Sequence, residues 1–299
     1  MKDFVEKYGC QLRRMDALSY VAHRNIYNLQ RGWVMDDSRP LNDPSTSPSG
    51  DANNLLCYCP DPERLCNLAL KNHEDFRTAE PFPHIVFDGF FPAMILKKVI
   101  EEVPERHPAE WTVWGSGSSS PESSLGVKLG ISSELGIGPI TRNFMLQLNS
   151  KTFLLFLETL TGVKGLIGDP SFQGGGLHST GRGGRLRVHA DADRHPLGRP
   201  FCQMINMITF LNPDWLEPYG GALELWSRDG SQRIRSILPV FNRTIIFESG
   251  TNTFHGHPQP LNCPHNRHRL SLASYFYKIN RPLDRNYVGF QPKVNWIRD

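Results

Sequence analysis

From Ser171 onward, apolar and polar residues alternate along the chain, and this two-residue period predicts β-strands, because successive side chains of a strand face opposite sides. Turn sequences such as NPDW, EPYGG and SRDG separate the predicted strands. The strands are expected in RLRVHADA, MINMITFLN, GALELW, IRSILP, RTIIFES and RLSLASYFYKI, and an earlier one in HIVF. Many short strands that follow helices favour an antiparallel β-sandwich or barrel with helices packed on one face.

Before this β region, apolar residues recur at helical spacing. The clearest helix is predicted to begin after Asn149 or Ser150 and to end at Gly162. Its regularly spaced apolar side chains are expected in the core: Phe153, Phe156, Leu157 and Leu160. Further helices are predicted in DPERLCNLALKN, with Asp61 as the N-cap, in AMILKKVIEEVP after Pro92, and in GPITRNFMLQLNS.

The composition divides the chain into three parts. Residues 1–78 combine the sequence DALSYVAHRNIYNLQRGW, predicted as an amphipathic helix, with a stretch rich in Pro, Ser, Asp and Asn that is typical of an exposed linker. We expect residues 79–283 to form the folded domain and residues 284–299 to form a C-terminal tail. Inside the domain, the stretch from Trp111 to about Gly138, with SGSSSPESS at its centre, is predicted to be a flexible loop.

Composition and charge narrow the class of protein. Hydrophobic residues make up 39% of the 299 residues, which is enough for a packed core, and a net charge of +3 is too small to predict a nucleic-acid partner. The six cysteines lack the paired C-x-x-C spacing of a zinc site and predict no disulfide framework. The charged N-terminus and the lack of a long apolar run predict neither a secretion signal nor a membrane partner. We therefore expect a cytoplasmic protein with reduced thiols, and a homodimer is one option for its oligomeric state.

The segment RVHADADRH places two histidines and two aspartates within nine residues. Residues two apart in a strand face the same side, so His189 and Asp191 present an imidazole and a carboxylate to one metal ion. Asp193 and His195 are also candidates by spacing, but the single residue between His189 and Asp191 keeps both of these within reach of one ion. We expect Asp193 and His195 to line a loop or a substrate entrance, or to be solvated.

A third ligand has to come from a distant part of the chain. The segment FHGHP follows the strand RTIIFES after a turn and offers His255 or His257, which have the same parity. Two imidazoles and one carboxylate leave three positions of an octahedral ion open. This set suits iron(II) that must bind both a co-substrate and dioxygen.

An open iron site needs a source of electrons, and a 2-oxo acid can chelate the ion through its keto oxygen and a carboxylate. Its far carboxylate then needs a fixed cation. Arg269 suits this role because a guanidinium grips a carboxylate through two parallel hydrogen bonds, and Ser271 lies two residues further on the same strand face. Arg185, with the same parity as His189, and Asn206, on the next strand, are further candidates for contact with the co-substrate.

Three motifs, HAD at 189–191, FHGHP at 254–258 and RLS at 269–271, together resemble the iron(II)- and 2-oxoglutarate-dependent oxygenases, most of all their prolyl-4-hydroxylase-like branch. The similarity spans about residues 80–283 and includes PFPHIVFDGFFP, GGGLH, FLNPDW, YGGALELW and PVFNRTIIFES. The HxD pattern alone is a weak signal, whereas the ordered set is specific. The resemblance implies an α+β, mainly β fold: a double-stranded β-helix, or jelly-roll, with helices packed on one face.

The resemblance also implies roles for individual residues. Iron would be held by His189, Asp191 and His255, and the far carboxylate of 2-oxoglutarate would be bound by Arg269. His257 would then lie next to the ligands without binding the metal. The implied cofactor is iron(II), with 2-oxoglutarate and dioxygen as co-substrates and ascorbate as a reductant.

The implied reaction is hydroxylation of an aliphatic C–H bond, with conversion of 2-oxoglutarate to succinate and carbon dioxide. The substrate would be an amino acid, a peptidyl residue such as proline, or a biosynthetic small molecule. Collagen-type prolyl 4-hydroxylases have lysine where Arg269 stands, and related halogenases lack the carboxylate that Asp191 supplies, so Asp191 favours hydroxylation over chlorination. The alternative is a non-oxidising, metal-binding jelly-roll, such as a cupin-like sensor or isomerase.

Overall fold

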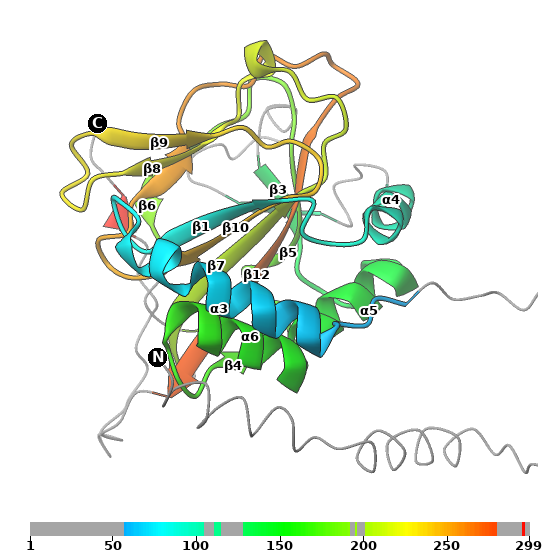
Figure 1. The fold of residues 1–299 in the computed structure, drawn as a ribbon. Coiled ribbons are helices and arrows are strands. Elements are labelled where there is room, and N and C mark those ends of the chain that lie inside the picture. Colours follow the sequence, from blue (N-terminus) through cyan, green and yellow to red (C-terminus); the bar gives the residue numbers. More distant parts are fainter. Residues whose placement is uncertain are drawn as a thin grey trace, which may run out of the picture. The chain divides into compact units, whose positions relative to one another are not determined.

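Two antiparallel β-sheets form the body of the unit that runs from Asn54 to Asp299 (Figure 1). The computed structural model describes residues 57–104, 111–114, 128–191, 195, 201–279 and 295–296. Three predicted features lie outside these residues: the N-terminal amphipathic helix, the loop sequence SGSSSPESS and most of the C-terminal tail. None of the described helices is both long enough and apolar enough to cross a membrane.

The larger sheet brings together strands from distant parts of the chain. In order across the sheet they are β1 (His84–Asp88), β10 (Arg243–Glu248), β7 (Phe201–Phe210), β12 (Arg269–Ile279), β5 (Gly176–Thr180), β3 (Lys128–Ile131) and β2 (Thr112–Trp114), and β4 (Ile167–Gly168) also pairs with β12. The strands predicted in HIVF, MINMITFLN, RTIIFES and RLSLASYFYKI are thereby confirmed.

The smaller sheet carries the segments that contain the predicted metal ligands. Its order is β13 (Asn295–Trp296), β6 (Leu186–Ala190), β11 (His255–His257), β8 (Leu223–Trp226) and β9 (Arg233–Ile237). Strand β13 comes from the predicted tail and pairs with β6, so that Trp296 lies opposite His189. The two sheets and the helices confirm the predicted α+β, mainly β fold class.

The helices cover the outer face of the larger sheet, where Figure 1 shows α3, α5 and α6 on the side away from β8 and β9. They are α3 (Pro62–Thr78), α4 (Ala93–Glu101), α5 (Pro139–Leu148) and α6 (Lys151–Thr161), and a short 3-10 helix η2 spans Glu217–Tyr219. Asp61 caps α3 and Ser150 caps α6 by accepting hydrogen bonds from backbone N–H groups, as predicted. Gly162 ends α6 with a φ of 78°, a left-handed conformation that glycine adopts without strain.

The helices and the outer face of the sheet share one apolar core. Phe153 and Phe156 of α6 pack in the same cluster as Leu272 and Phe276 of β12. Helix α3 contributes Leu65, Ala69 and Phe76 to this cluster. Helix α3 is therefore part of the core of this unit, and the boundary expected at residue 78 stays a prediction for the rest of the N-terminal region.

The space between the two sheets has an apolar part and a polar part. The apolar part contains Phe210, Ile245 and Phe247 of the larger sheet and Leu223 and Leu225 of the smaller sheet. The ring of Phe247 lies 4.9 Å from that of His255, between centroids, so the apolar cluster borders the metal-ligand candidates directly. Burial of this apolar surface fixes the sheets face to face and so positions the polar part.

The prediction of a flexible loop from Trp111 to Gly138 was wrong in part, because this stretch contains β2 and β3. Both strands are short, and β3 has Gly130 at its centre, so neither shows a clear two-residue period. Strand β5 was also not predicted. All five of its residues, GLHST, are buried, which removes the alternation expected of a strand with one solvated face.

Candidate metal centre

Three predicted ligands converge in the polar part of the interior. His189 on β6 and His255 on β11 are directly opposite each other in the antiparallel register, with ring centroids 4.7 Å apart. Asp191 follows β6, and its Oδ1 lies 3.4 Å from Nε2 of His189 and 3.7 Å from Nε2 of His255. The possible ligand atoms of these residues all lie within 4.8 Å of one another. The structure therefore brings together the set that the sequence predicted.

Gly256 explains how the two strands come so close. A Cβ atom built on Gly256 would lie 2.9 Å from the carbonyl oxygens of both Leu186 and Arg187 on β6. Such contacts are shorter than real Cβ atoms show, so the glycine between the two histidines of HGH is required for this approach of β11 to β6.

Backbone carbonyls fix the tautomer of both imidazoles. Nδ1 of His189 lies 2.8 Å from the carbonyl oxygen of Arg187, and Nδ1 of His255 lies 3.0 Å from that of Thr253. A carbonyl only accepts hydrogen bonds, so Nδ1 carries the proton and Nε2 keeps the lone pair that a metal ion needs. Burial lowers the pKa of His255 to about 4, which keeps this imidazole neutral at pH 7.

Two amides of the larger sheet orient the carboxylate of Asp191. Asn206 Nδ2 donates to Asp191 Oδ2 over 2.7 Å, and Gln203 Nε2 donates to the same oxygen over 3.1 Å and to Ser249 Oγ over 3.0 Å. These contacts occupy Oδ2, while Oδ1 faces the two imidazoles. Burial raises the pKa of Asp191, but the neighbouring His255, His189 and Lys128 lower it below its usual value. The carboxylate is therefore ionised and fixed in one orientation.

Asn206 points into the interior and binds a candidate metal ligand. Its amide binds Asp191, and contact with a co-substrate stays a prediction. Gln203 was missed, because the two-residue period from Asn206 does not include it. The pairing of β7 with β12 shifts register between Phe276 and Tyr277, and this irregularity brings Gln203 to the interior face as well.

Arg269 begins β12 as a buried cation on the same interior face. Its Nε donates to the carbonyl oxygen of Gly221 over 2.6 Å, and its guanidinium carbon lies 4.9 Å from the ring centroid of Phe210. Burial lowers the pKa of Arg269 to about 10, so the side chain remains charged at pH 7. The bond to Gly221 uses one of five N–H donors, and Ser271 is buried two residues further along the strand. This geometry suits the binding of a carboxylate.

The other candidates lie in different surroundings. Arg185 is exposed and precedes the first residue of β6, so its contact with a co-substrate stays a prediction. His257 is buried, and its ring nitrogens have no hydrogen-bond partner within the described residues. The cluster of possible ligands contains His255 and not His257, in agreement with the choice that the resemblance implied.

His195 lies outside the helices and strands and is not solvated. It is 1% exposed, and its Nε2 lies 3.1 Å from Oδ2 of Asp169, whose carboxylate also accepts hydrogen bonds from Ser171 and Gln173. Of the expected surroundings, only solvation is contradicted for His195, because a carboxylate from the segment before β5 holds the imidazole in the interior. Asp193 lies outside the described residues.

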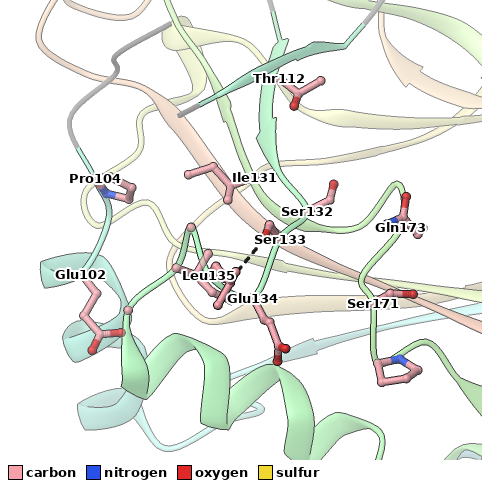
Figure 2. Close-up of a pocket in the computed structure, with 14 residues that line it drawn as sticks. Glu102, Pro104, Thr112, Ile131, Ser132, Ser133, Glu134, Leu135, Ser171 and Gln173 are labelled. Atoms are coloured by element: carbon pink, nitrogen blue, oxygen red, sulfur yellow. Dashed lines mark hydrogen bonds between the residues drawn. The ribbon is translucent and has the colours of Figure 1, made fainter. Parts of the chain in front are cut away.

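A separate hollow of about 1100 Å³ lies beside the end of β3, between Ile131, Glu134 and Gln173 (Figure 2). Its wall includes the turn in which the backbone N–H of Leu135 donates to Ser133 Oγ over 3.2 Å. None of the residues that line it is a candidate metal ligand. The hollow is therefore distinct from the metal centre.

The donor set fits iron(II). It consists of two neutral imidazoles and one carboxylate without a thiolate, and such a set leaves positions open on a six-coordinate ion. The cysteines among the described residues are free thiols and are not part of the cluster. The carboxylate and both imidazoles are held by hydrogen bonds, which is typical of metal ligands.

Comparison with known proteins gives a relative by sequence and several by structure. Over 94 residues the chain is 30% identical to the prolyl 3-hydroxylase OGFOD1 of Mus musculus, and the match covers 30% of this chain and 16% of that protein. The chain thus spans only a small part of the length of this relative. A prolyl hydroxylase of Trichoplax adhaerens, solved with a peptide fragment of the hypoxia inducible factor oxygen degradation domain, is similar with a TM-score of 0.50 and 14% identity, over 72% of this chain and 91% of that one.

A Pseudomonas putida prolyl-4-hydroxylase has a TM-score of 0.47 and 18% identity, over 70% of this chain and 98% of that one. Residues 175–277 match the model of the 2OG-Fe(II) oxygenase superfamily, and this segment contains all three candidate ligands and Arg269. The likeness to the Trichoplax protein agrees with a jelly-roll core. The chain is thus similar to the 2OG-Fe(II) oxygenase superfamily over residues 175–277, and its fold is similar to that of the Trichoplax prolyl hydroxylase.

Proposed function

We propose that this protein is an iron(II)- and 2-oxoglutarate-dependent dioxygenase that hydroxylates an aliphatic C–H bond and releases succinate and carbon dioxide. The single observation that carries the proposal is the convergence of His189, Asp191 and His255 in the same interior as the buried cation Arg269. A metal site alone would be compatible with many functions. The buried arginine adds a binding group for an anionic co-substrate.

In this proposal His189, Asp191 and His255 hold the iron, and Arg269 with Ser271 binds the far carboxylate of 2-oxoglutarate. When bound, the ferrous ion supplies the activation of dioxygen that oxidation of an unactivated C–H bond requires. The chain itself provides orientation. The carbonyls of Arg187 and Thr253 hold the imidazole tautomers, and the amides of Asn206 and Gln203 keep Asp191 in place.

The chain also provides a shielded interior. Both histidines and Arg269 are at most 6% exposed, and the apolar cluster around Phe247 borders the site on one side. Exclusion of water strengthens the interaction of Arg269 with an anion and protects reactive species from side reactions. These are the contributions that a protein makes when a metal performs the oxidation.

We propose a peptidyl residue, with proline first, as the substrate. The support is the matching stretch in the mouse prolyl 3-hydroxylase and the similar fold of the Trichoplax prolyl hydroxylase, which was solved with a peptide fragment. An amino acid or a biosynthetic small molecule would fit the same metal centre. Ascorbate is proposed as the reductant that keeps the iron in its ferrous state.

Purified protein supplied with iron(II), ascorbate and 2-oxoglutarate tests the proposal. We expect succinate to form, and formation to increase when a peptide that is a substrate is added. Screening proline-containing peptides and free amino acids by mass spectrometry should identify the product that gains one oxygen atom. Metal binding without any consumption of 2-oxoglutarate would instead favour a non-oxidising, cupin-like protein.

A further inference from the structure

A second cation lies near Arg269 on the inner face of the larger sheet. Thr180 of β5 is directly opposite Lys128 of β3 on one side and directly opposite Arg269 of β12 on the other. Residues directly opposite each other in neighbouring strands present their side chains on the same face. Lys128 and Arg269 therefore point toward the same interior, with a single strand between them.

Lys128 is close enough to both Asp191 and Arg269 for their charges to affect it. Burial lowers the pKa of Lys128 to about 8, with an opposing effect of Asp191 and a further lowering by Arg269. The charge of Lys128 in turn affects Asp191, His255 and His257. Together with the strand register, these interactions place Lys128 on the same inner face as Arg269 and near the metal carboxylate.

His257 approaches the same space from the smaller sheet. It is 3% exposed, and neither ring nitrogen has a hydrogen-bond partner within the described residues. After burial, the charges of Arg269 and Lys128 are the main causes that lower its pKa. A buried imidazole without partners is unusual in a folded protein, and such a group is a sign of a ligand that completes its hydrogen bonds.

Resting on the proposed function, we propose that Lys128 and His257 are co-substrate-binding residues that line the 2-oxoglutarate pocket between the iron and Arg269. Lys128 pairs with a carboxylate of 2-oxoglutarate from the larger sheet, and His257 donates a hydrogen bond to it from the smaller sheet. The same space separates the metal ligands from the arginine anchor, and a five-carbon dicarboxylate that reaches both must pass through it.

The charges of the site support a preference for a dianion. A ferrous ion and Arg269 together already balance Asp191 and the two carboxylates of 2-oxoglutarate. Lys128 is half-buried and adds one positive charge beyond this balance, in surroundings where charges interact more strongly than in water. The pocket should therefore discriminate against 2-oxo acids with a single carboxylate more strongly than Arg269 alone would.

Calorimetric titration of 2-oxoglutarate into the full-length protein loaded with Mn²⁺ measures this binding without turnover. We expect Lys128→Met to raise the dissociation constant (Kd) of 2-oxoglutarate on the order of tenfold or more, and Lys128→Arg to restore part of the affinity. His257→Phe should also raise this Kd, while His257→Gln, which keeps a hydrogen-bonding group, should raise it less. The Kd of Mn²⁺ should stay near the wild-type value in all four variants.

Exposed residues of the same type provide matched controls. Lys97→Met on α4 and His265→Gln make similar chemical changes at the surface and should leave the Kd of 2-oxoglutarate unchanged. Thermal unfolding of each variant separates loss of binding from loss of fold. If Lys128→Met or His257→Phe does not fold, the Lys128→Arg and His257→Gln variants carry the test.

The outcomes separate this inference from the proposed function. Wild-type protein that binds Mn²⁺ but not 2-oxoglutarate would overturn the proposed function. Wild-type protein that binds 2-oxoglutarate, with an unchanged Kd in the Lys128 and His257 variants, would overturn only the present inference, and Lys128 would then be free to bind an acidic group of the substrate. A change in the variants of only one of the two residues overturns the assignment of the other.

Discussion

The two sheets contribute different chemistry to one interior. The smaller sheet supplies both imidazoles from neighbouring strands, and Asp191 follows directly after β6. The larger sheet supplies Arg269 and the amide of Asn206, which binds Asp191. The metal geometry therefore depends on one local register within the smaller sheet. Binding of a co-substrate depends instead on how the larger sheet is placed opposite the smaller sheet.

Loss of an imidazole from the smaller sheet should have the largest effect. His189→Ala or His255→Ala leaves two protein ligands, and we expect metal affinity to fall by more than the roughly 10–100-fold that loss of an outer hydrogen-bond partner of a metal site costs. Turnover of 2-oxoglutarate should disappear with it. Metal content after dialysis and succinate formation measure both effects, with the exposed His265→Ala as control. Wild-type metal affinity in either variant would refute the assignment of that ligand.

Replacement of Arg269 on the larger sheet should separate the binding of 2-oxoglutarate from the binding of the metal. Arg269→Lys keeps the charge but loses the paired hydrogen bonds of the guanidinium, so the Kd of 2-oxoglutarate should rise about tenfold or more. Metal affinity should change little, because Arg269 does not belong to the ligand cluster. Titration of metal and of 2-oxoglutarate into the same variant checks the prediction. Equal loss of both would mean that the sheets do not act separately.

A substitution in the larger sheet, at Asn206, should have a smaller effect on metal affinity. Asn206→Ala removes the shorter of the two amide contacts to Asp191 and leaves that of Gln203. We expect metal affinity to fall about tenfold, at the lower end of the range for such partners. At saturating metal, the Kd of 2-oxoglutarate should be unchanged. A rise of this Kd with unchanged metal affinity would show that Asn206 contacts the co-substrate instead.

The smallest effect is expected at the edge of the smaller sheet. Arg185 is exposed, so it can attract a dianion only through solvent. Arg185→Ala should raise the Kd of 2-oxoglutarate about twofold at most, and the difference should vanish at high salt. Titrations at low and high ionic strength test this. A large effect that persists at high salt would place Arg185 in direct contact with the co-substrate.

Two of the candidate metal ligands could be predicted from a local signal in the sequence. The HxD pattern on a predicted strand pointed to His189 and Asp191, whereas the HGH segment left His255 and His257 open, and the family resemblance selected His255. Arg269 was predicted because it is a guanidinium on the apolar strand that follows the histidine segment, and the resemblance implied its role. The strands that carry His189 and Arg269 were predicted, whereas β11, which carries His255, was not.

The other features of the site could not be predicted, because they depend on contacts between residues far apart in the chain. Lys128 approaches Arg269 only because β5 lies between their strands, and β5 has no alternation that could reveal it. Gln203 reaches Asp191 through a register shift of β7, and the burial of His195 depends on Asp169 from a turn. Pairing of strands and side-chain contacts of this kind are set by the folded sheets and not by local patterns.

One anaerobic titration tests the central claim most directly. The protein is loaded with iron(II), 2-oxoglutarate is added without oxygen, and the visible absorption is recorded for the wild type and for His255→Ala. The wild type should bind a single ion per chain and develop a weak charge-transfer band that saturates at one 2-oxoglutarate per ion, whereas the variant should show no band. Stoichiometric binding of iron(II) by the wild type, with no spectral change on addition of 2-oxoglutarate, would contradict the account.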